Sequence, residues 1–441
     1  MRLDRKHIAR TAVAILVVAA LAAVAAGLAS ANKSGVAANK SVSGKITFFG
    51  IWSADEQTAF EKVIAGFNKK FPNVTVDYQS KGNDIPTILA TAIAAGHPPD
   101  MADVAQPGLV KQLAKQGHLK PITYAKSAIK ANFKPVWLSL GTFSGKPYAL
   151  VFKASNKSTL WYNVPAFKQA GINAPKTWSA LLKDANTLKA SGTPAYSLCG
   201  ASGWTLTDIF ENIYLRTFGP AKYNALSAHK IKWTDKSVTK AMQEMKQIIG
   251  DSSNLAGGRS SALQTDYPTC VDHAFATPSK GSMVLQGDFV ANEILQATKA
   301  KPGSGFNTVP FPAIKKGPNS TAVEIGGDLI IAFHSNPAIK AFVTYLASAN
   351  AAKIWAHLGG FGTGNKNMPT SVYPDKITRS TETPLSKAKS VVFDMSDEQP
   401  ASFGATTGQG EWGLFQKFLE NPGSYKNIQK QLESAAKKAY K

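Results

Sequence analysis

The chain has 441 residues, of which 44% are hydrophobic, and 50 lysines and arginines against 28 aspartates and glutamates give it a formal net charge of +22. This length exceeds what one hydrophobic core usually organises, so two lobes are expected. The charge does not indicate nucleic-acid binding, because after residue 31 only Arg216, Arg259 and Arg379 carry the planar guanidinium that reads bases and phosphates. The scattered lysines indicate a solvated surface; the alternative is a salt-sensitive attraction to an anionic cell envelope.

Residues 1–31 have the pattern of an export signal. Basic residues at the start are followed by the uncharged stretch 11–32, and Ala29, Ser30 and Ala31 form a small-residue cleavage site. We expect cleavage after Ala31, which leaves 410 residues with a charge of +19. An uncleaved anchor is the alternative, since about 20 apolar residues can span a bilayer. No cysteine lies near the cleavage site. We therefore expect an exported protein, periplasmic or on the outer face of the cytoplasmic membrane, without a cysteine-linked lipid.

The sequence has two cysteines, Cys199 and Cys270. An exported chain meets an oxidising compartment, where two cysteines can form a disulfide. The alternative is a pair of buried thiols, and the residues alone leave both open.

The first elements of the mature chain alternate between strands and helices. After a small, polar lead-in, residues 32–44, the apolar run 45–52 predicts a buried strand. Ser53 and Glu56 have the spacing of a capping box, and apolar side chains then recur every three or four residues from Phe60 to Phe71 before Pro72. Strands are expected over 74–78 and 101–105, and helices over 86–95 and 107–116. This alternation predicts a mostly parallel sheet with right-handed crossovers.

Helices dominate the rest of the chain. Thr177 is expected to cap a helix that ends near Gly192, and further helices are expected over 208–219 and 238–249. Two more helices begin at Asn336 and Asn350, each with an amide cap, and the chain ends in a basic amphipathic helix from about residue 425.

Signatures of catalysis are missing from the mature sequence. It has no GxSxG, GxxxxGK[ST], HExxH or GxGxxG motif, and the six histidines after residue 31 lack metal-ligand spacing. A glycosidase needs two carboxyl groups that flank the scissile bond. The acidic residues that can supply such a pair are Asp55, Glu56, Asp208, Glu211 and Asp288. Capping and surface roles explain most of these equally well, so we expect no enzyme, no cofactor and no metal.

Aromatic residues recur beside polar ones at the ends of the predicted elements. An aromatic ring stacks on the apolar C–H face of a sugar, while neighbouring polar groups bind its hydroxyls. Taken singly, each aromatic is more often a core residue. The aromatic positions are Trp52, Phe152, Trp161, Trp204, Phe289, Phe361 and Trp412.

Six segments carry a resemblance to a known family. In chain order they are ITFFGIWSADEQTAFEKVIAGFNKKFPNVTVDY, HPPDMADVAQPGLVKQLAKQGHLKPI, SGKPYALVFKASNKSTLWYN, AGINAPKTWSALL, GSMVLQGDFV and GGDLIIAF. In order and spacing they resemble the large solute-binding proteins that deliver sugars to ABC importers, of the maltose-binding type and especially its alpha-glucoside-like branch. The resemblance covers nearly all of residues 45–441.

This resemblance implies a fold of two α/β lobes joined by several hinge crossovers, with mostly parallel sheets and a ligand held in the cleft. Lobe 1 is expected to comprise residues 45–153 and 327–366, and lobe 2 residues 154–326 and 367–441. The resemblance also implies that Cys199 and Cys270 pair in a disulfide.

The resemblance implies a set of ligand-binding residues drawn from both lobes. The first strand, the two crossings and the facing lobe would supply Trp52, Glu56, Lys153, Asn156, Trp204, Asp208, Glu211, Asp288, Phe289, Asp328, Phe361 and Trp412. Two features depart from the family pattern. Residues 271–280 are less aromatic than in relatives, and Lys153 and Asn156 stand where some sugar binders carry a carboxylate.

We therefore expect a monomeric, non-catalytic protein that binds a sugar or short oligosaccharide, such as an alpha-glucoside, and delivers it to an ABC permease in the membrane. Nucleic acid is not an expected partner. One alternative is a binding protein for a non-sugar or anionic solute, which Lys153 and the high charge suggest. The other is a secreted carbohydrate-active enzyme.

Overall fold

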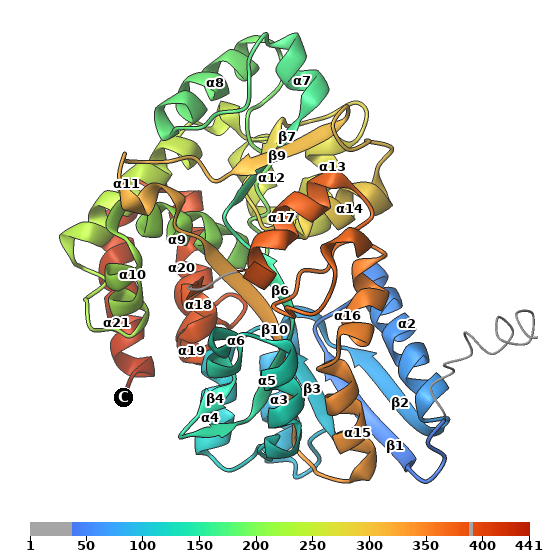
Figure 1. Ribbon diagram of the computed structural model, residues 1–441. Helices are drawn as coiled ribbons and strands as arrows, with labels where there is room; N and C mark the ends of the chain where they lie inside the picture. The colour runs from blue at the N-terminus through green and yellow to red at the C-terminus, as the bar shows by residue number, and fades with distance from the viewer. Residues whose placement is uncertain (1–37, 388–390) are drawn as a thin grey trace, which may run out of the picture.

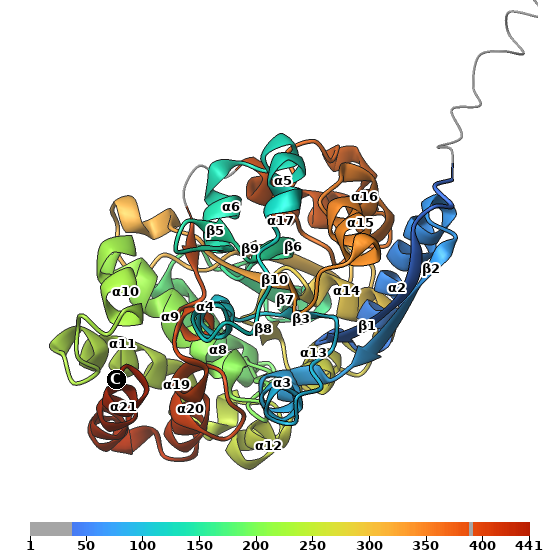
Figure 2. The same cartoon turned by 90° about the horizontal axis from the view of Figure 1, so that it is seen from below.

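A computed structural model describes residues 38–387 and 391–441, which form two α/β lobes (Figure 1). The predicted signal, residues 1–31, and the first part of the lead-in, residues 32–37, lie outside the described residues. No helix in the described part of the chain is long and apolar enough to cross a membrane. In two views the strands β1 and β2 and the helices α20 and α21 lie on opposite sides of the molecule (Figures 1 and 2).

Lobe 1 is the part of the chain that packs around a six-stranded sheet. The strand order is β11-β10-β3-β1-β2, and β6 pairs with β10 off this path. Along β1 the apolar side chains of Ile46 and Phe48 are buried, as the predicted strand requires. The strands are β1 (Ser43–Gly50), β2 (Asn73–Ser80), β3 (Met101–Val104), β6 (Ala149–Asn156), β10 (Glu324–Ala332), β11 (Val392–Phe393) and the separate hairpin β4 (Thr142–Phe143) and β5 (Lys146–Pro147).

Helices cover the lobe 1 sheet. On α2 the side chains of Phe60, Val63, Ile64 and Phe67 are buried at the predicted helical spacing, and the helix ends at Lys70 before Pro72. The helices are α2 (Ala54–Lys70), η1 (Gly82–Asp84), α3 (Ile85–Ala94), α4 (Pro107–Lys115), η2 (Thr123–Ala125), α5 (Lys126–Asn132), α6 (Pro135–Leu140), α15 (Pro337–Leu346), α16 (Ala349–Ala356) and η5 (Thr370–Val372).

Lobe 2 packs around a three-stranded antiparallel sheet of order β8-β7-β9 and a central helix, α9. Because α10, α11 and α20 contact α9, even its polar residues from Thr205 to Thr217 are buried. The elements are β7 (Thr159–Asn163), α7 (Val164–Gln169), α8 (Trp178–Ala190), α9 (Trp204–Phe218), α10 (Pro220–Ser227), α11 (Lys236–Ile249), η3 (Ser252–Asn254), α12 (Gly258–Gln264), α13 (Tyr267–Phe275), β8 (Met283–Val284), α14 (Val290–Ala297), β9 (Phe306–Pro310), η4 (Pro318–Thr321), α18 (Met395–Glu398), α19 (Ala401–Gly404), α20 (Gly410–Glu420), η6 (Pro422–Ser424) and α21 (Tyr425–Ala439).

Three segments join the lobes. The chain leaves lobe 1 along β6, returns along β10 and crosses again at β11, which follows α17 (Lys376–Lys387). In β11 the side chain of Val392 packs in the core of lobe 2 and that of Phe393 in the core of lobe 1. Tyr373 and Leu385, beyond the predicted boundary at residue 366, also pack in the core of lobe 1. The residue boundaries of the lobes remain a proposal.

The predicted two-lobed α/β fold is confirmed, but the expectation of mostly parallel sheets is wrong. β1 pairs in parallel with β2 and β3, whereas β10 runs antiparallel to β3 and β6, and the lobe 2 sheet is antiparallel. The reason is the route of the chain. An outgoing strand and the strand that returns beside it must run in opposite directions.

Helix caps agree with the sequence in part. The side chains of Thr177 and Asn336 accept hydrogen bonds from the backbone N–H groups of their helices, as predicted. The predicted cap at Asn350 is wrong, because Ser348 caps α16 two residues earlier. The capping box of Ser53 and Glu56 is also wrong: the Ser53 side chain makes no cap hydrogen bond, and Glu56 binds Lys153 instead. Glu56 thus forms an ion pair with the buried ammonium group of Lys153 and not the predicted hydrogen bond to the local backbone.

Cys199 and Cys270 form a disulfide, which confirms the pairing that the resemblance implied. The two residues are 71 positions apart, with Cα atoms at 5.3 Å. Cys199 lies just before α9 and Cys270 lies in α13. The disulfide therefore ties together the starts of two helices that face lobe 1.

Candidate ligand-binding cleft

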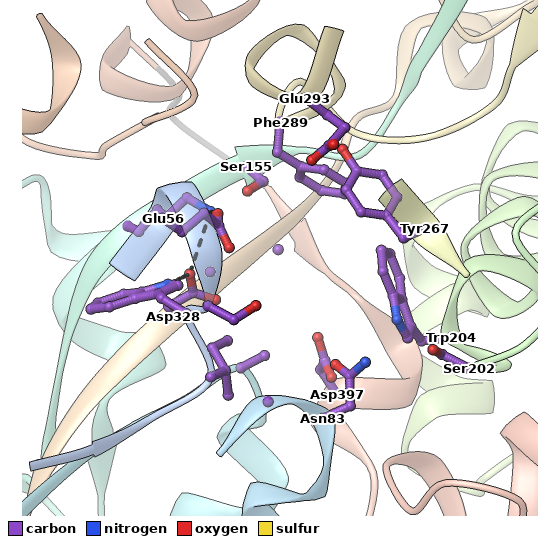
Figure 3. Close-up of a pocket in the computed structure, with 18 of the residues that line it drawn as sticks. Glu56, Asn83, Ser155, Ser202, Trp204, Tyr267, Phe289, Glu293, Asp328 and Asp397 are labelled. Carbon is purple, nitrogen blue, oxygen red and sulfur yellow. Dashed lines mark hydrogen bonds and ion pairs between the residues drawn. The ribbon is translucent and has the colours of Figure 1, made fainter. Parts of the chain in front are cut away.

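A cavity of about 460 Å³ lies between the two lobes (Figure 3). Lobe 1 lines it with the end of β1, the start of α2, the residues after β3, and the crossing strands β6 and β10. Lobe 2 lines it with the starts of α9, α13 and α20 and with α14. Ligands of α/β proteins are usually held beyond the carboxyl ends of parallel strands, and β1 and β3 both end at this cavity. The fold thus builds the site from segments far apart in the sequence.

The lobe 1 wall is a hydrogen-bonded network of four predicted site residues. The indole Nε1 of Trp52 donates to the Asp328 carboxylate at 2.7 Å. The ammonium group of Lys153 lies 2.6 Å from Glu56 and 3.7 Å from Asp328. Burial alone would lower the pKa of Lys153, but Glu56 and Asp328 raise it above its ordinary value. Burial raises the pKa of Asp328, against the attraction of Lys153. Lys153 therefore keeps its charge and fixes both carboxylates.

Trp52 also connects this network to the core of lobe 1. The side chain is completely buried, with ring centroids 4.6 Å from Phe60 and 5.0 Å from Trp355. Its backbone carbonyl accepts a hydrogen bond from the Tyr78 hydroxyl at 2.9 Å. Because so many contacts hold it, Trp52 positions Asp328 at the cavity more than it offers its own ring.

The lobe 2 wall consists of three aromatic rings. Trp204 lies 5.8 Å from Tyr267 and 6.0 Å from Phe289, and Tyr267 lies 5.4 Å from Phe289, as measured between ring centroids. These rings stand across the cavity from Glu56 and Asp328 (Figure 3). Trp412 adds a further aromatic residue at the cavity. A cluster of aromatic rings on one lobe thus faces charged groups on the other.

Lys157 lies at the floor of the cavity, on the first crossing between the lobes. Its ammonium group is 3.2 Å from Asp208 and 4.0 Å from Asp397, and it donates a short hydrogen bond to Asp394. Burial raises the pKa of Asp208 to about 8 despite Lys157. For Asp394, burial is outweighed by the Lys157 charge and hydrogen bond, which lower its pKa. The cation holds together groups from β6, α9 and the segment after β11.

Within the described residues, one carboxylate group has the spacing to hold a cation. Asp208, Glu324 and Asp394 are buried, and each places an oxygen within 4.8 Å of the others. The Lys157 ammonium already contacts Asp208 and Asp394. It therefore supplies positive charge where a metal ion would have to bind.

Seven of the twelve predicted site residues line the cavity. They are Trp52, Glu56, Lys153, Trp204, Phe289, Asp328 and Trp412. The other five, Asn156, Asp208, Glu211, Asp288 and Phe361, are not among the cavity-lining residues.

The five remaining residues have structural contacts near the crossings. Asn156 donates its backbone N–H to Asp288 at 2.5 Å, and its side chain accepts from the Ser158 N–H. Glu211 accepts hydrogen bonds from Tyr223 and from the start of α18. The ring of Phe361 is completely buried, stacked on Trp355 at 5.1 Å. Asp208 is buried against Lys157, as described above.

Sequence reasoning missed several residues of the cavity. Gln106, Lys157, Tyr267, Glu293 and Asp397 all line it. Gln106 follows the carboxyl end of β3, a position that could have indicated a site. Tyr267 is three residues before Cys270, so the disulfide was a signal that it lies near Trp204. For Glu293 and Asp397 the local sequence carries no such signal.

Three buried polar atoms of the cavity wall lack a hydrogen-bond partner among the described residues. They are Oε1 of Gln106, Nε1 of Trp204 and the hydroxyl of Tyr267. A buried polar group without a partner costs about 1–3 kcal/mol. A ligand with hydroxyl groups can satisfy such atoms, so their position favours a polar ligand with apolar faces.

Comparison with known proteins assigns the family. Residues 52–353 match the bacterial extracellular solute-binding proteins, a span that contains both walls of the cavity except Ile51, Asp394, Asp397 and Trp412. The chain belongs to this family. The family resemblance that the sequence segments predicted is therefore confirmed.

Individual relatives of this solute-binding protein agree over most of its length. It is 28% identical to the osmoprotective compounds-binding protein GgtB of Synechocystis over 369 residues, which cover 82% of this chain and 86% of GgtB. It is also 28% identical to the alpha-glucosides-binding periplasmic protein AglE of Rhizobium meliloti over 372 residues, with 82% and 81% covered. A multiple sugar-binding protein of Streptococcus mutans is 26% identical over 345 residues, with 76% and 78% covered.

Solved structures share the fold at lower sequence identity. The bacterial solute receptor AcbH superposes with a TM-score of 0.80 at 20% identity, covering 91% of this solute-binding protein and all of AcbH. The raffinose complex of RafE gives 0.72 at 17% identity, covering 90% and 100%. These matches support the two-lobed fold.

Proposed function

We propose that this protein binds a sugar or short oligosaccharide in the cleft between its lobes and delivers it to an ABC permease in the membrane. The observation that carries this proposal is the pairing of unlike walls. Three rings of lobe 2 face the hydrogen-bonding groups of lobe 1 across about 460 Å³. A sugar presents both an apolar C–H face and hydroxyl groups, and therefore matches both walls at once.

The names of the relatives support a sugar ligand. AglE is described as binding alpha-glucosides, and the Streptococcus mutans relative as binding multiple sugars. An alpha-glucoside is therefore the first candidate. The three crossings between the lobes fit a hinge that closes around the ligand and presents the closed form to the permease.

The proposed ligand contacts come from the residues that line the cavity. Trp204 and Phe289 supply stacking surfaces, as does Tyr267, and Glu56, Asp328 and Gln106 accept hydrogen bonds from hydroxyl groups. Lys153 holds Glu56 and Asp328, and Trp52 holds Asp328. Trp412 closes the wall beside Trp204. Asn156, Asp208, Glu211, Asp288 and Phe361 act behind this surface, as support for the crossings.

We propose binding without catalysis. A glycosidase requires one carboxyl group to protonate the leaving group and a second to act as nucleophile or base. In this cleft Glu56 and Asp328 share one lysine, and Asp394 is held by another, so none of these three carboxylates is free to form such a pair. The solute-binding family supports the same conclusion.

The test is a titration of the purified protein with neutral di- and oligosaccharides, followed by tryptophan fluorescence and melting temperature. We expect saturable changes and a rise in melting temperature, because a ligand that binds the folded state stabilises it. A response to a phosphorylated or carboxylated solute and to no sugar would overturn the proposal. Release of shorter sugars during the titration, measured by chromatography, would indicate an enzyme instead.

We also propose that the exported protein works as a monomer that is not tethered through a cysteine-linked lipid. The sequence has two cysteines, and both are in the disulfide. Attraction of the +19 mature chain to an anionic envelope can keep it near the permease. N-terminal sequencing of the native protein tests this: a chain that starts before Asn32 would retain the signal as its tether.

A further inference from the structure

The charge of the cleft is opposite to the charge of the whole chain. The protein has 50 lysines and arginines against 28 aspartates and glutamates. The described residues that line the cavity, in contrast, include seven carboxylates and two lysines. An excess of negative charge at this cavity of a strongly basic protein is a property of the site and not of the composition.

The two lysines do not balance these carboxylates. Lys153 is held by Glu56 and Asp328, and Lys157 by Asp208 and Asp394. Lys153 thus already has two acidic partners within 4.0 Å, and Lys157 has three, since Asp397 lies 4.0 Å from it. Neither lysine is available to an anionic ligand, which argues against the anionic solute considered from the sequence.

Three further carboxylates at the cavity have no ion-pair partner within the described residues. Asp55 is in the first turn of α2 in lobe 1, whereas Asp266 and Glu293 belong to lobe 2. The pKa of Glu293 is raised to about 7, first by burial and then by the negative charges of Asp272, Asp55, Glu56 and Asp266. Asp266 has a local role at the start of α13, where its side chain accepts a hydrogen bond from the Thr269 N–H. Glu293, half-buried beside the rings of Tyr267 and Phe289, faces only like charges (Figure 3).

Two other features of the cavity favour a polar organic ligand. Gln106 is only 5% exposed, and its amide oxygen has no partner among the described residues although it lines the same cavity. The rings of Trp204, Tyr267 and Phe289 form a cluster next to the carboxylates. Aromatic faces attract organic cations as well as sugar C–H groups. An organic cation fits this combination better than a metal ion, which would leave the rings and most of the cavity unfilled.

We propose that the preferred ligand is an amino sugar, a mono- or oligosaccharide with a protonated amine, and that Asp55 and Glu293 receive this amine from opposite lobes. The inference rests on the proposed function and narrows its ligand class. The ammonium group relieves the repulsion between the carboxylates of the two lobes, so that the charge of the ligand favours closure. The sugar ring stacks on the lobe 2 rings, and the amide oxygen of Gln106 accepts a hydrogen bond from a hydroxyl or amine.

The test compares sugars that differ only in having an amine in place of the 2-hydroxyl group on each ring. Isothermal titration calorimetry at about pH 7 measures the affinity of the purified protein for each sugar. The pairs are glucosamine with glucose, galactosamine with galactose, and the chitosan disaccharide with cellobiose. We expect the amino sugar of at least one pair to bind about tenfold more tightly than its neutral partner, and added salt to reduce this preference.

Variants that remove one negative charge test which residues cause the preference for the amino sugar. Glu293→Gln and Asp55→Asn keep the size of the side chain and are expected to reduce the preference for the amino sugar at least about threefold, with little change for the neutral partner. Glu61→Gln is the matched control, because Glu61 is an exposed carboxylate on the same helix as Asp55 and is outside the cavity. Melting temperatures of all three variants verify that they fold.

The outcomes separate the two proposals. The amino-sugar inference is overturned if the protein responds only to neutral sugars, in this panel or in the titration of the preceding section. It is also overturned if both members of each pair bind equally well. Either result leaves the sugar-binding function intact. A preference that survives both charge-removing variants also overturns it. A protein that responds to none of the sugars of either experiment contradicts the proposed function itself.

Discussion

The two lobes contribute unlike walls to one cleft. In lobe 1, Trp52, Glu56, Lys153 and Asp328 bind one another directly, with contacts from 2.6 to 3.7 Å. In lobe 2, Trp204 and Tyr267 pack by their rings, and the buried Trp204 N–H and Tyr267 hydroxyl have no partner within the part of the chain that the structure describes. The stability of the fold and the affinity for the ligand therefore depend largely on different side chains. The charged groups of the lobe 1 wall bind one another and stabilise the fold. The rings and the polar atoms of the lobe 2 wall are available to the ligand.

The largest expected effect comes from the disulfide, which positions the lobe 2 wall. Replacing both Cys199 and Cys270 by Ala should lower the free energy of unfolding by about 4 kcal/mol, the value expected for a loop of this length. Sugar affinity should fall too, because the disulfide ties the segments that carry Trp204 and Tyr267. Chemical denaturation and fluorescence titration measure the two effects. Reduction of the wild-type protein should reproduce them, and a variant as stable as the wild type would contradict the prediction.

Removal of the central charge should break the lobe 1 wall. Lys153→Met leaves Asp328 and Glu56 without a cation, and we expect the free energy of unfolding to fall by about 2–3 kcal/mol. The effect is smaller than for a fully buried pair, because the Glu56 side chain is 35% exposed. Lys189→Met is the control: its pair with Asp251 is more exposed, so denaturation should show less than about 1 kcal/mol. Equal losses in the two variants would refute the role of Lys153.

Removal of a ring from lobe 2 should reduce affinity more than stability. We expect Trp204→Ala to weaken binding of the cognate sugar by about 2 kcal/mol, or roughly 30-fold, since a central aromatic contact is lost. Trp178→Ala is a matched control, because Trp178 is likewise the first residue of a helix but is buried away from the cavity. That control should lower the melting temperature and leave the dissociation constant unchanged. Unaltered sugar binding by Trp204→Ala would show that the ring is not a ligand contact.

The final prediction is a pH dependence of stability that comes from buried carboxyl groups outside the lining of the cleft. Burial raises the pKa of Asp208 to about 8 and those of Asp288 and Glu398 to about 7. The folded state therefore holds protons that the unfolded state releases near pH 4, so these groups stabilise the protein most below the unfolded pKa. The stabilisation is lost as the pH rises through the folded values, by about 1 kcal/mol per pH unit for each proton.

Denaturation at a series of pH values between about 5 and 9 measures this slope. Asp208→Asn should flatten it above about pH 7, because the neutral amide has no proton to lose. A free energy of unfolding that rises with pH over this range would contradict the assignment of Asp208, Asp288 and Glu398 as protonated groups.

Elements with a strong local pattern were predictable from the sequence. The apolar spacing of α2, the strand before it, the cap at Thr177 and the family segments all act within a few residues or through chain order. The same local reasoning failed for Glu56, whose spacing from Ser53 suggested a cap. The ion pair with Lys153, 97 positions away, gives its carboxylate a stronger partner than a helix N–H.

In lobe 2, membership of the cleft was predictable for residues at the starts of helices and failed for residues further along α9. Trp204 and Phe289 precede or begin helices, and both reach the cavity. Asp208 and Glu211 lie further along α9, which other helices surround, so their carboxylates turn to Lys157 and α18. Glu293 and Asp397 were missed, because nothing in their local sequence shows which segment of the other lobe they face.

The two-lobed class, the family, the boundaries of the strongly patterned helices and two of the stacking rings, Trp204 and Phe289, could be predicted from the sequence, because these follow from local periodicity and from the order of segments. The tertiary structure decided the antiparallel crossings, the partners of Lys153 and Lys157, and the negative charge of the cleft in a positively charged chain. Those features depend on which side chains meet across hundreds of residues. Burial then sets how strongly the meeting charges interact.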